Sequence, residues 1–320
     1  MTASLSPLAP STERSTPPQP TDQQPGARRR APSHSGFSAG WSRTVIVGLV
    51  TALLMIPFMW MISIAFKGPT ETYSYPPKLI PESPTWENFV QVWTVSNLSV
   101  GMVNSLIVAV LAVAGNCIGA VAAGYAFAKI DFRGSKLLFL LVLATAMVPA
   151  VVQLIPLFLL VQDVPLVGGN DVIGQGGTGL LNTHLGLALP LLIQPLNIYL
   201  ARQYFLDMPD EIADAGRIDG ASEFRIFWNL YLPLAKPIVA TIAILSFTGA
   251  WEDFLWPLVS TSSSSMQTLP LVLSSFTSSG AVQYGPMMAS AIVASLPVVV
   301  LFLLTQRHFV NGLSAGGVKG

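Results

Sequence analysis

The sequence predicts an all-α membrane protein whose chain crosses the bilayer six times. Hydrophobic residues make up 52% of the 320 residues and charged residues only 10%, which is too little polar surface for a water-soluble domain of this length. Apolar stretches of about 20 residues recur along the chain, and each can cross about 30 Å of hydrocarbon as a helix. We place them at residues 44–66, 103–128, 137–160, 185–205, 237–260 and 287–306.

The segment before the first span has a different composition. Residues 1–40 are rich in Pro, Ser, Thr and Gln and carry Arg28, Arg29 and Arg30. Such a segment cannot bury enough apolar surface to offset the entropy of ordering the chain. We therefore predict a disordered cytoplasmic tail over residues 1–40 and a six-helix transmembrane domain over residues 41–320. The first span is too long and too far from the start for a cleaved signal peptide, so we expect it to remain as an anchor.

Basic residues are distributed unequally between alternate loops. One side of the membrane receives only Lys67 and Lys78, and the other side receives all the remaining Lys and Arg residues. Because basic residues near a span disfavour translocation, the side rich in Lys and Arg is predicted to be cytoplasmic. Both termini and the loop over residues 206–236 then lie inside the cell. The formal net charge is zero, so nothing in the charge balance favours a nucleic acid partner.

The cytoplasmic loop over residues 206–236 is predicted to contain a short helix. Pro209 stands near its first position, and Asp210 and Glu211 follow it. Proline is well suited to a helix start, and the helix dipole stabilises acidic side chains in the first turn. We expect this helix to end near Ile218.

A turn and a second short helix are expected next in the same loop. Gly220 supplies the turn, because glycine adopts backbone conformations that other residues resist. The second helix starts near Ala221 and carries Phe224, Phe227 and Tyr231 at about helical spacing. This aromatic stripe either packs on the ends of the protein's own spans or forms a docking surface, and the two interpretations are compatible.

The same loop resembles the EAA loop of ABC importer permeases, in which Glu-Ala-Ala is followed by a Gly and then by Ile-x-Leu-Pro. Asp214 and Gly216 depart from that pattern, since they replace its Glu and its second Ala. In that family the loop fits a cleft on a separate ATPase subunit and moves the membrane helices. The resemblance implies a coupling loop formed by Glu211, Asp214, Ala215, Gly216, Asp219, Gly220, Ala221, Phe224, Phe227, Leu230, Leu232 and Pro233.

The chain has no nucleotide-binding signature of its own. A Gly-x-x-x-x-Gly-Lys-Ser/Thr loop, which would cradle phosphates, does not occur in the sequence. Gly174, Gly176 and Gly179 satisfy Gly-x-Gly-x-x-Gly, but they lie in a predicted outer loop with no preceding strand, so we interpret the match as fortuitous. We predict that this chain binds no cofactor or metal and that ATP and Mg belong to the partner ATPase.

The fifth span contains the first candidates for the substrate pathway: Trp251, Glu252, Asp253 and Trp256. Two adjacent acids at membrane depth are costly unless they face a cavity or a partner. Indole faces can stack on a sugar ring while carboxylates accept hydrogen bonds from its hydroxyls. The run WEDFLWPL also resembles the Trp-Asn-Glu-Phe-Leu-Trp-Pro-Leu run of carbohydrate permeases. The acids alternatively pair with the partner permease or hold the helix in a water-filled vestibule.

Two amides add to these candidates. Gln153 in the third span and Asn197 in the fourth are polar side chains within predicted helices. Each either lines the pathway or forms an interhelical hydrogen bond, which is the commoner use of an amide in a membrane.

The end of the chain resembles one subgroup of this family, the sugar-type members. Its last residues, QRHFVNGLSAGGVKG, resemble the Gly-Leu-Thr-x-Gly-x-Val-Lys-Gly ending of sugar-type members, with Ser314 in place of Thr. The resemblance implies an ABC importer type I permease in the lipid of a bacterial inner membrane. It also implies three partners: a second related permease subunit, a dimeric ABC ATPase and an extracellular solute-binding protein. An oligosaccharide, a monosaccharide, a polyol and a glycerol phosphate compound all remain open as substrates.

A different class of protein stays open beside this one. A secondary transporter could bind protons at Glu252 and Asp253 and use the membrane potential. An intramembrane enzyme has little support, because no Ser with His and no pair of Asp residues in separate spans forms a plausible catalytic set.

Overall fold

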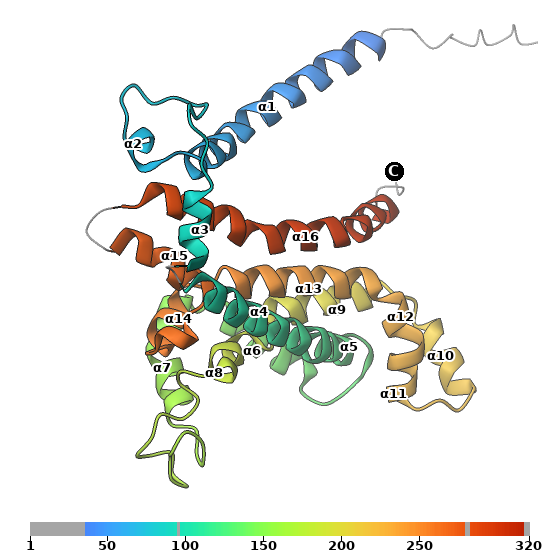
Figure 1. The fold of residues 1–320 in the computed structure, drawn as a ribbon. Coiled ribbons are helices and arrows are strands. Elements are labelled where there is room, and N and C mark those ends of the chain that lie inside the picture. The colour runs from blue at the N-terminus through green and yellow to red at the C-terminus, as the bar shows by residue number, and fades with distance from the viewer. Residues whose placement is uncertain (1–35, 95–96, 279–281, 317–320) are drawn as a thin grey trace, which may run out of the picture. The chain divides into compact units, whose positions relative to one another are not determined.

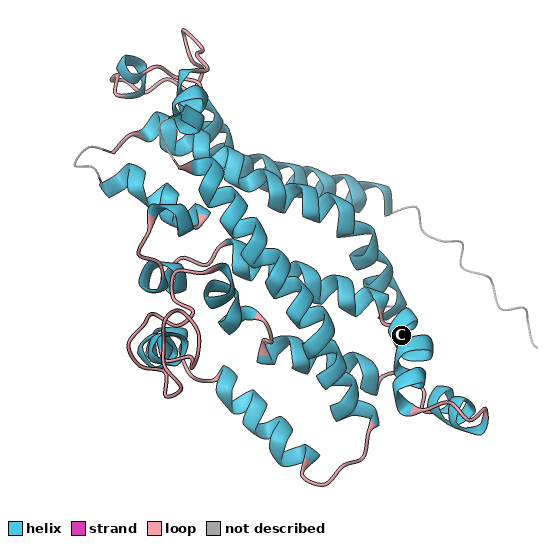
Figure 2. Cartoon of the chain, turned by 60° about the horizontal axis from the view of Figure 1, so that its bottom comes forward, coloured by secondary structure: helices cyan, strands magenta, loops and turns pink. Residues whose placement is uncertain are grey.

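The structure, a computed structural model, describes residues 36–94, 97–278 and 282–316, and every regular element in these ranges is a helix (Figure 2). The chain forms two compact units, Met1–Leu54 and Met55–Gly320. In the first unit the described part is the beginning of α1 (Gly36–Ala65), which starts inside the segment predicted as a tail. Residues 1–35 of that predicted tail lie outside the described residues.

Three of the six predicted spans are continuous helices. They are Arg43–Ala65 within α1, Leu98–Lys129, and Tyr284–Gln306 within α16 (Tyr284–Gly316). The second of them joins α4 (Leu98–Gly115), the π-helical segment η1 (Asn116–Ala120) and α5 (Val121–Lys129) in one helix. By length and composition, these three helices can cross a membrane as predicted.

The third and fourth predicted spans are each broken. The third consists of α6 (Ser135–Ala146) and α7 (Ala150–Gln162), which are bent by 105°. The fourth consists of α8 (His184–Ala188), the 3-10 turn η2 (Leu189–Leu191) and α9 (Pro195–Leu206), with a bend of 46°. Each of these two predicted spans is therefore a bent pair of helices and not one straight helix.

The fifth predicted span is also interrupted. It begins with α13 (Lys236–Trp251), which ends immediately before the two acids, and α14 (Leu255–Ser260) follows. A bend of 80° separates α13 from the preceding helical segment Glu223–Leu234. The described residues thus hold three full spans, or six if each bent pair counts as one span.

Prolines explain the breaks in the third and fourth spans. Pro149 immediately precedes α7, and Pro195 is the first residue of α9. Proline has no N–H to donate, and it pushes the preceding residue toward extended backbone. Gln194, which precedes Pro195, is accordingly extended, with φ −91° and ψ 131°. Both prolines are also favourable at a helix start, so one half of each span ends and the next begins.

Short helices occupy the connections at the two ends of the second unit. At one end lie α2 (Pro69–Thr72), α3 (Glu87–Thr94), η4 (Ser264–Met266) and α15 (Leu269–Ser278). At the opposite end of α13 lie α10, α11 and α12, described below (Figure 1). Predicted outer loops contact each other: Asn182 Oδ1 accepts hydrogen bonds from the N–H groups of Ser262 and Ser263, each at 3.1 Å.

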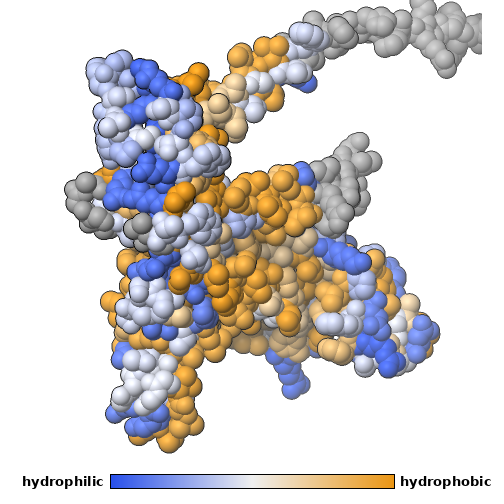
Figure 3. All heavy atoms as spheres, in the orientation of Figure 1, coloured by the Kyte–Doolittle hydropathy of each residue, from blue (hydrophilic) through white to orange (hydrophobic). Residues whose placement is uncertain are grey.

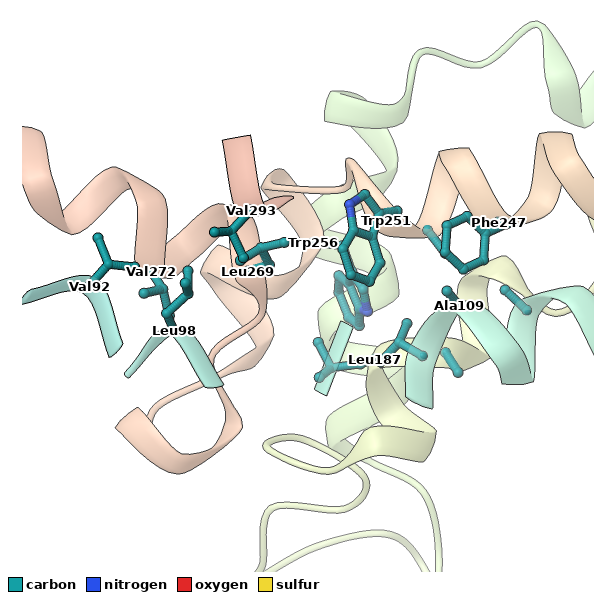
Figure 4. Close-up of a cluster of buried hydrophobic side chains, with 14 of the residues drawn as sticks. Val92, Leu98, Ala109, Leu187, Phe247, Trp251, Trp256, Leu269, Val272 and Val293 are labelled. Atoms are coloured by element: carbon teal, nitrogen blue, oxygen red, sulfur yellow. The ribbon is translucent and has the colours of Figure 1, made fainter. Parts of the chain in front are cut away.

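The second unit has two clusters of buried apolar side chains. One cluster lies around α4, α13, α15 and α16 and includes Phe247, Trp251 and Trp256 (Figure 4). The other lies around α5, α9 and the loop over residues 206–236 and includes Tyr125, Phe205 and Tyr231. The surface outside these clusters is apolar along the middle of the helices and hydrophilic at the α10–α11 end (Figure 3). Such a surface suits lipid along the helices and water at their ends.

Candidate functional site

The loop over residues 206–236 folds as the predicted helix, turn and helix. Its first arm is α10 (Glu211–Ile218), and its second arm comprises α11 (Glu223–Ile226), the π-helical segment η3 (Phe227–Tyr231) and α12 (Leu232–Leu234). Gly220 has φ +75°, a conformation that side chains resist. The N–H of Ala221 donates to the carbonyl of Gly216 at 2.9 Å, which closes the turn. We call this element, residues 207–236, the bracket.

Close packing holds the two arms of the bracket together. Gly216 is buried on the inner face of α10. A Cβ at this position would lie 2.9 Å from Cγ1 of Ile226 and 3.0 Å from Cδ1 of Leu230. Cγ1 lies in the middle of the buried Ile226 side chain, so even an alanine would require that side chain to shift, and a larger residue would push the arms apart. Gly216, which stands where the family pattern has Ala, therefore allows the two arms to pack closely.

Three charged side chains also connect the arms. Arg217 Nε donates to Glu223 Oε1 at 2.8 Å, and Arg217 Nη1 donates to Asp214 Oδ1 at 3.1 Å. The hydrogen bond and charge of Glu223 raise the pKa of Arg217. The three side chains are about half exposed, so water screens each pair, and the pairs contribute little to stability.

The inner face of the bracket is anchored by aromatic rings. Tyr231 is fully buried, and its hydroxyl donates to the carbonyl of Pro209 at 3.1 Å. Its ring lies 5.3 Å from the ring of Tyr125 in α5 and 6.2 Å from that of Phe205 in α9, measured between centroids. Phe227 is also buried and lies 4.8 Å from Tyr125. The second arm is thus packed directly onto two spans.

Lys129, the last residue of α5, forms a second anchor. Its side chain is only 5% exposed, and its Nζ donates to the carbonyl of Met208 at 2.6 Å and to Asp210 Oδ1 at 2.5 Å. The ammonium also lies 5.7 Å from the centre of the Tyr231 ring. The hydrogen bond and charge of Lys129 lower the pKa of Asp210. In the sequence Lys129 indicates only which side of the membrane its loop is on, because no local pattern shows which distant loop it contacts.

The outer face of the bracket carries an exposed aromatic pair. Phe224 is 73% exposed and Trp228 is 56% exposed, and their rings stack with centroids 6.1 Å apart and planes at 16°. The predicted single stripe is therefore wrong, since Phe224 lies on one face whereas Phe227 and Tyr231 lie on the other. The π-helical geometry of η3, with more residues per turn than an α-helix, contributes to this division.

The remaining predicted coupling residues fall into two groups. Those exposed on the bracket are Glu211, Asp214, Ala215, Asp219, Gly220 and Pro233. Those partly buried between the arms or against the spans are Ala221, Leu230 and Leu232. The loop thus has a charged and apolar outer side and a packed inner side.

A cavity of about 980 Å³ lies where the broken spans meet. It is bounded by the break before α7, the break before α9 and the break after α13. Of the predicted pathway residues, Gln153, Glu252, Asp253 and Trp256 line this cavity, whereas Trp251 and Asn197 do not. Among the residues that the structure describes, neither Glu252 nor Asp253 forms an ion pair.

Trp251 and Trp256 are both core residues, and each is 4% exposed. The Nε1–H of Trp251 donates to the carbonyl of Ala294 and that of Trp256 to the carbonyl of Gly186, each at 3.1 Å. Trp251 also stacks on Phe247, with ring centroids 5.4 Å apart (Figure 4). The expectation that Trp251 offers a free face to a sugar does not fit this packing, because its polar and apolar surfaces are already occupied.

Asn197 belongs to a buried network between helices. Its Nδ2 donates to Asn116 Oδ1 at 2.9 Å and to Ser246 Oγ at 3.0 Å. Of the two uses considered for this amide, the structure therefore favours the interhelical hydrogen bond. Gln153 is exposed, and its amide donates to the carbonyl of Val148 at the break before α7.

The chain belongs to the family of binding-protein-dependent transport system inner membrane components, which it matches over residues 115–314. It is similar to the arabinooligosaccharides transport system permease protein AraQ of Halalkalibacterium halodurans, with 34% identity over 88% of this chain and 96% of that protein. It is also similar to the sn-glycerol-3-phosphate transport system permease protein UgpE of Yersinia pestis, with 31% identity over 84% of this chain and 93% of that protein. The chain is thus a multi-pass permease subunit of an ABC importer.

A solved structure has the same fold. It is that of a bacterial ABC transporter involved in the import of the acidic polysaccharide alginate, with a TM-score of 0.72 and 22% sequence identity. The match covers 87% of this chain and 98% of that chain. At this identity the likeness concerns the fold alone, and it confirms the predicted all-α permease architecture.

Proposed function

We propose that this chain forms, with a second related permease subunit, the translocation pathway of an ATP-driven carbohydrate importer in a bacterial plasma membrane. The names of the similar permeases, which refer to arabinooligosaccharides and to sn-glycerol-3-phosphate, support a hydroxyl-rich substrate. In this proposal a dimeric ABC ATPase binds ATP and Mg, and an extracellular solute-binding protein delivers the sugar. The chain itself binds no cofactor and catalyses no reaction.

The bracket is proposed as the docking site of the ATPase. This proposal depends on one observation, which is that the two faces of the bracket differ. Phe224 and Trp228 form an exposed apolar pair on one face, while Tyr231 and Lys129 fasten the other face to the spans. An exposed stacked aromatic pair flanked by charges is typical of a surface that another protein covers.

The anchors explain how motion at the bracket would reach the membrane. A displacement of the outer face acts on η3, whose rings pack on Tyr125 in α5 and Phe205 in α9. These two helices pack so closely that a Cβ at Gly124 would lie 2.4 Å from the Cβ of Ala201. Packed elements of this kind move as rigid bodies, because their interiors resist deformation. α9 begins at the cavity wall, so the bracket is linked mechanically to the cavity.

The docking proposal is tested by replacing both exposed rings with alanine. In membranes that contain the partner permease and the ATPase, Phe224→Ala with Trp228→Ala is expected to reduce both copurification of the ATPase and sugar uptake by at least about tenfold, since interface aromatics commonly contribute 2 kcal/mol or more. Phe132→Ala, in the other cytoplasmic loop between spans, is the matched control, because Phe132 is also exposed. Normal copurification of the ATPase with the double variant would contradict the proposal.

The cavity favours a neutral substrate. Glu252 and Asp253 supply hydrogen-bond acceptors for hydroxyl groups, and Gln153 adds an amide. Two carboxylates that form no ion pair with any residue in the described part of the chain would repel a phosphate or a uronate. We therefore infer a neutral sugar or oligosaccharide rather than a glycerol phosphate compound, with the partner permease completing the pathway.

The substrate inference is tested with the assembled importer in proteoliposomes. Uptake of a neutral labelled arabino-oligosaccharide is expected, and labelled glycerol 3-phosphate is expected to be carried poorly. Preferential uptake of the phosphate compound would overturn the inference. Uptake that survives ATP depletion and collapses with a protonophore would instead favour the proton-coupled alternative.

A further inference from the structure

The break in the fourth span leaves backbone groups that need partners. η2 ends at Leu191 and α9 begins at Pro195, so the regular hydrogen bonds of the helix are interrupted between them. A carbonyl or N–H group without a partner is costly inside a bilayer, because no water is available to replace the lost bond. The groups at this break therefore need partners, either within the protein or in a water-filled cavity.

The side chain of Asn116 in the second span binds both sides of the break. Its Nδ2 donates to the carbonyl of Leu191 at 2.7 Å, and its Oδ1 accepts from the N–H of Gln194 at 2.8 Å. The second Nδ2 hydrogen is used by the carbonyl of Ala112 at 2.9 Å, and Oδ1 also accepts from Asn197. Asn116 is fully buried, and all of its hydrogen-bonding groups are used.

The backbone around Asn116 is shaped for this contact. Asn116 is the first residue of the π-helical segment η1, a local distortion that is frequent at functional sites. Gly115 and Gly119 flank it, and both face the break. A Cβ at Gly115 would lie 2.5 Å from the carbonyl oxygen of Leu192, and one at Gly119 would lie 2.8 Å from Cδ1 of Ile193. The two glycines therefore let the backbone of the second span touch the broken segment.

The broken segment is also part of the cavity wall. Leu191, Ile193, Gln194 and Pro195 line the cavity, whereas Asn116 does not. The side chain that satisfies the break is thus separate from the surface that a substrate would meet.

We propose that Asn116 is a positioning residue, whose amide replaces the missing backbone partners at the break of the fourth span and so holds the wall of the transport cavity in place. This inference rests on the proposed function only in treating the cavity as part of the pathway. Ser246 on α13 joins the network through Asn197, which places the side chain of Asn116 among the second, fourth and fifth spans.

The test measures two quantities separately: the accessibility of the cavity wall, as a labelling rate, and the uptake of sugar. Cys117 is replaced by Ser to remove the native thiol, and Ile193→Cys, which is exposed to the cavity, reports on the wall. The assembled importer in membranes is labelled with a small membrane-impermeant methanethiosulfonate reagent. Asn116→Leu, which keeps the volume and removes the amide, is expected to change the labelling rate about tenfold, since two partly buried backbone groups at the break lose their partners.

A second variant covers the case in which Asn116→Leu fails to assemble. Asn116→Ser is small, and its hydroxyl can bond to the carbonyl of Ala112 one turn earlier, so the helix itself tolerates it. It still leaves Leu191 and Gln194 without the amide. The labelling rate is therefore expected to change in the same direction as in Asn116→Leu.

Two control variants separate the role of Asn116 from general effects of buried polar groups. Asn104→Leu removes another buried amide of the same span, which donates to the carbonyls of Ser265 and Gln267 and is hydrogen-bonded to His184 at the start of α8, before the break. Ser246→Ala removes the last member of the network and leaves both bonds at the break intact. Neither variant is expected to alter the labelling rate by more than about twofold, because the bonds at the break remain.

Each outcome has a defined meaning. Wild-type labelling of Ile193→Cys in both Asn116 variants would overturn the proposal, even if transport were lost, because the wall would then be held by other contacts. Changed labelling with a rise in the KM for uptake supports it. If the wild-type importer carries no carbohydrate, the proposed function fails, and the labelling comparison still decides the role of Asn116.

Discussion

The buried anchor at Lys129 gives a quantitative prediction about coupling. Lys129→Met keeps the length and the apolar stem of the side chain and removes its ammonium, which binds Met208 and Asp210. A hydrogen bond from a charged donor to a carbonyl contributes about 1.5–3 kcal/mol. The bond to Asp210 adds less, because that carboxylate is 81% exposed and water screens it. A loss of about 2 kcal/mol raises the equilibrium constant for detachment of the bracket from α5 about 30-fold.

The matching assay compares sugar transported with ATP hydrolysed in proteoliposomes that contain the complete importer. The exposed face of the bracket is unchanged in Lys129→Met, so the ATPase is still expected to bind. Transport per ATP is expected to fall about tenfold, because motion of the bracket is no longer passed to α5. Lys136→Met is the control, since Lys136 lies in the first turn of α6, the next helix along the chain, and is exposed. Wild-type transport per ATP in Lys129→Met would refute the role of the anchor.

Three further predictions concern the bracket and its base. Gly220→Val forces a β-branched residue into φ +75° at a cost of about 1–3 kcal/mol, so uptake is expected to be lost although the protein inserts, whereas Gly220→Asn is expected to retain uptake. Asp210 has a lowered pKa in the folded protein, so its contribution to stability is present above its ordinary pKa and disappears as the pH falls through the lowered value. Thermal unfolding of wild type and Asp210→Asn should therefore converge at acid pH, and a constant difference would contradict this. Gly124→Leu should separate α5 from α9 and abolish assembly, measured by copurification of the subunits, because no room exists beside Ala201.

The positions of the spans and of the bracket follow from local rules. Long apolar runs must form helices in lipid, and the acidic start, the turn at Gly220 and the end of α10 at Ile218 are set by neighbouring residues. Pro149 and Pro195 stand in the sequence where the breaks occur. The apolar runs around them are nevertheless long enough to indicate single spans. Hydropathy alone cannot show that a long apolar run contains two helices, because it does not measure hydrogen bonding.

The roles of individual polar and aromatic side chains were predicted less well. The residue types of Trp251 and Asn197 suggest the pathway, yet both side chains are buried among the helices. The spacing of the stripe in the bracket suggests one face, whereas η3 separates Phe224 from Tyr231. These errors share a cause: a pattern along one helix does not specify what lies on each side of it.

By itself the sequence determined that this protein is a multi-pass helical membrane protein whose loop over residues 206–236 forms a helix, turn and helix, because the length of an apolar run and the turn chemistry of a loop act over neighbouring residues. Only the tertiary structure decided that Lys129 holds the bracket and that Asn116 holds the broken fourth span. Those contacts join residues 79 and 78 positions apart, Lys129 to Met208 and Asn116 to Gln194. Their partners are chosen by the packing of whole helices, which no local pattern records.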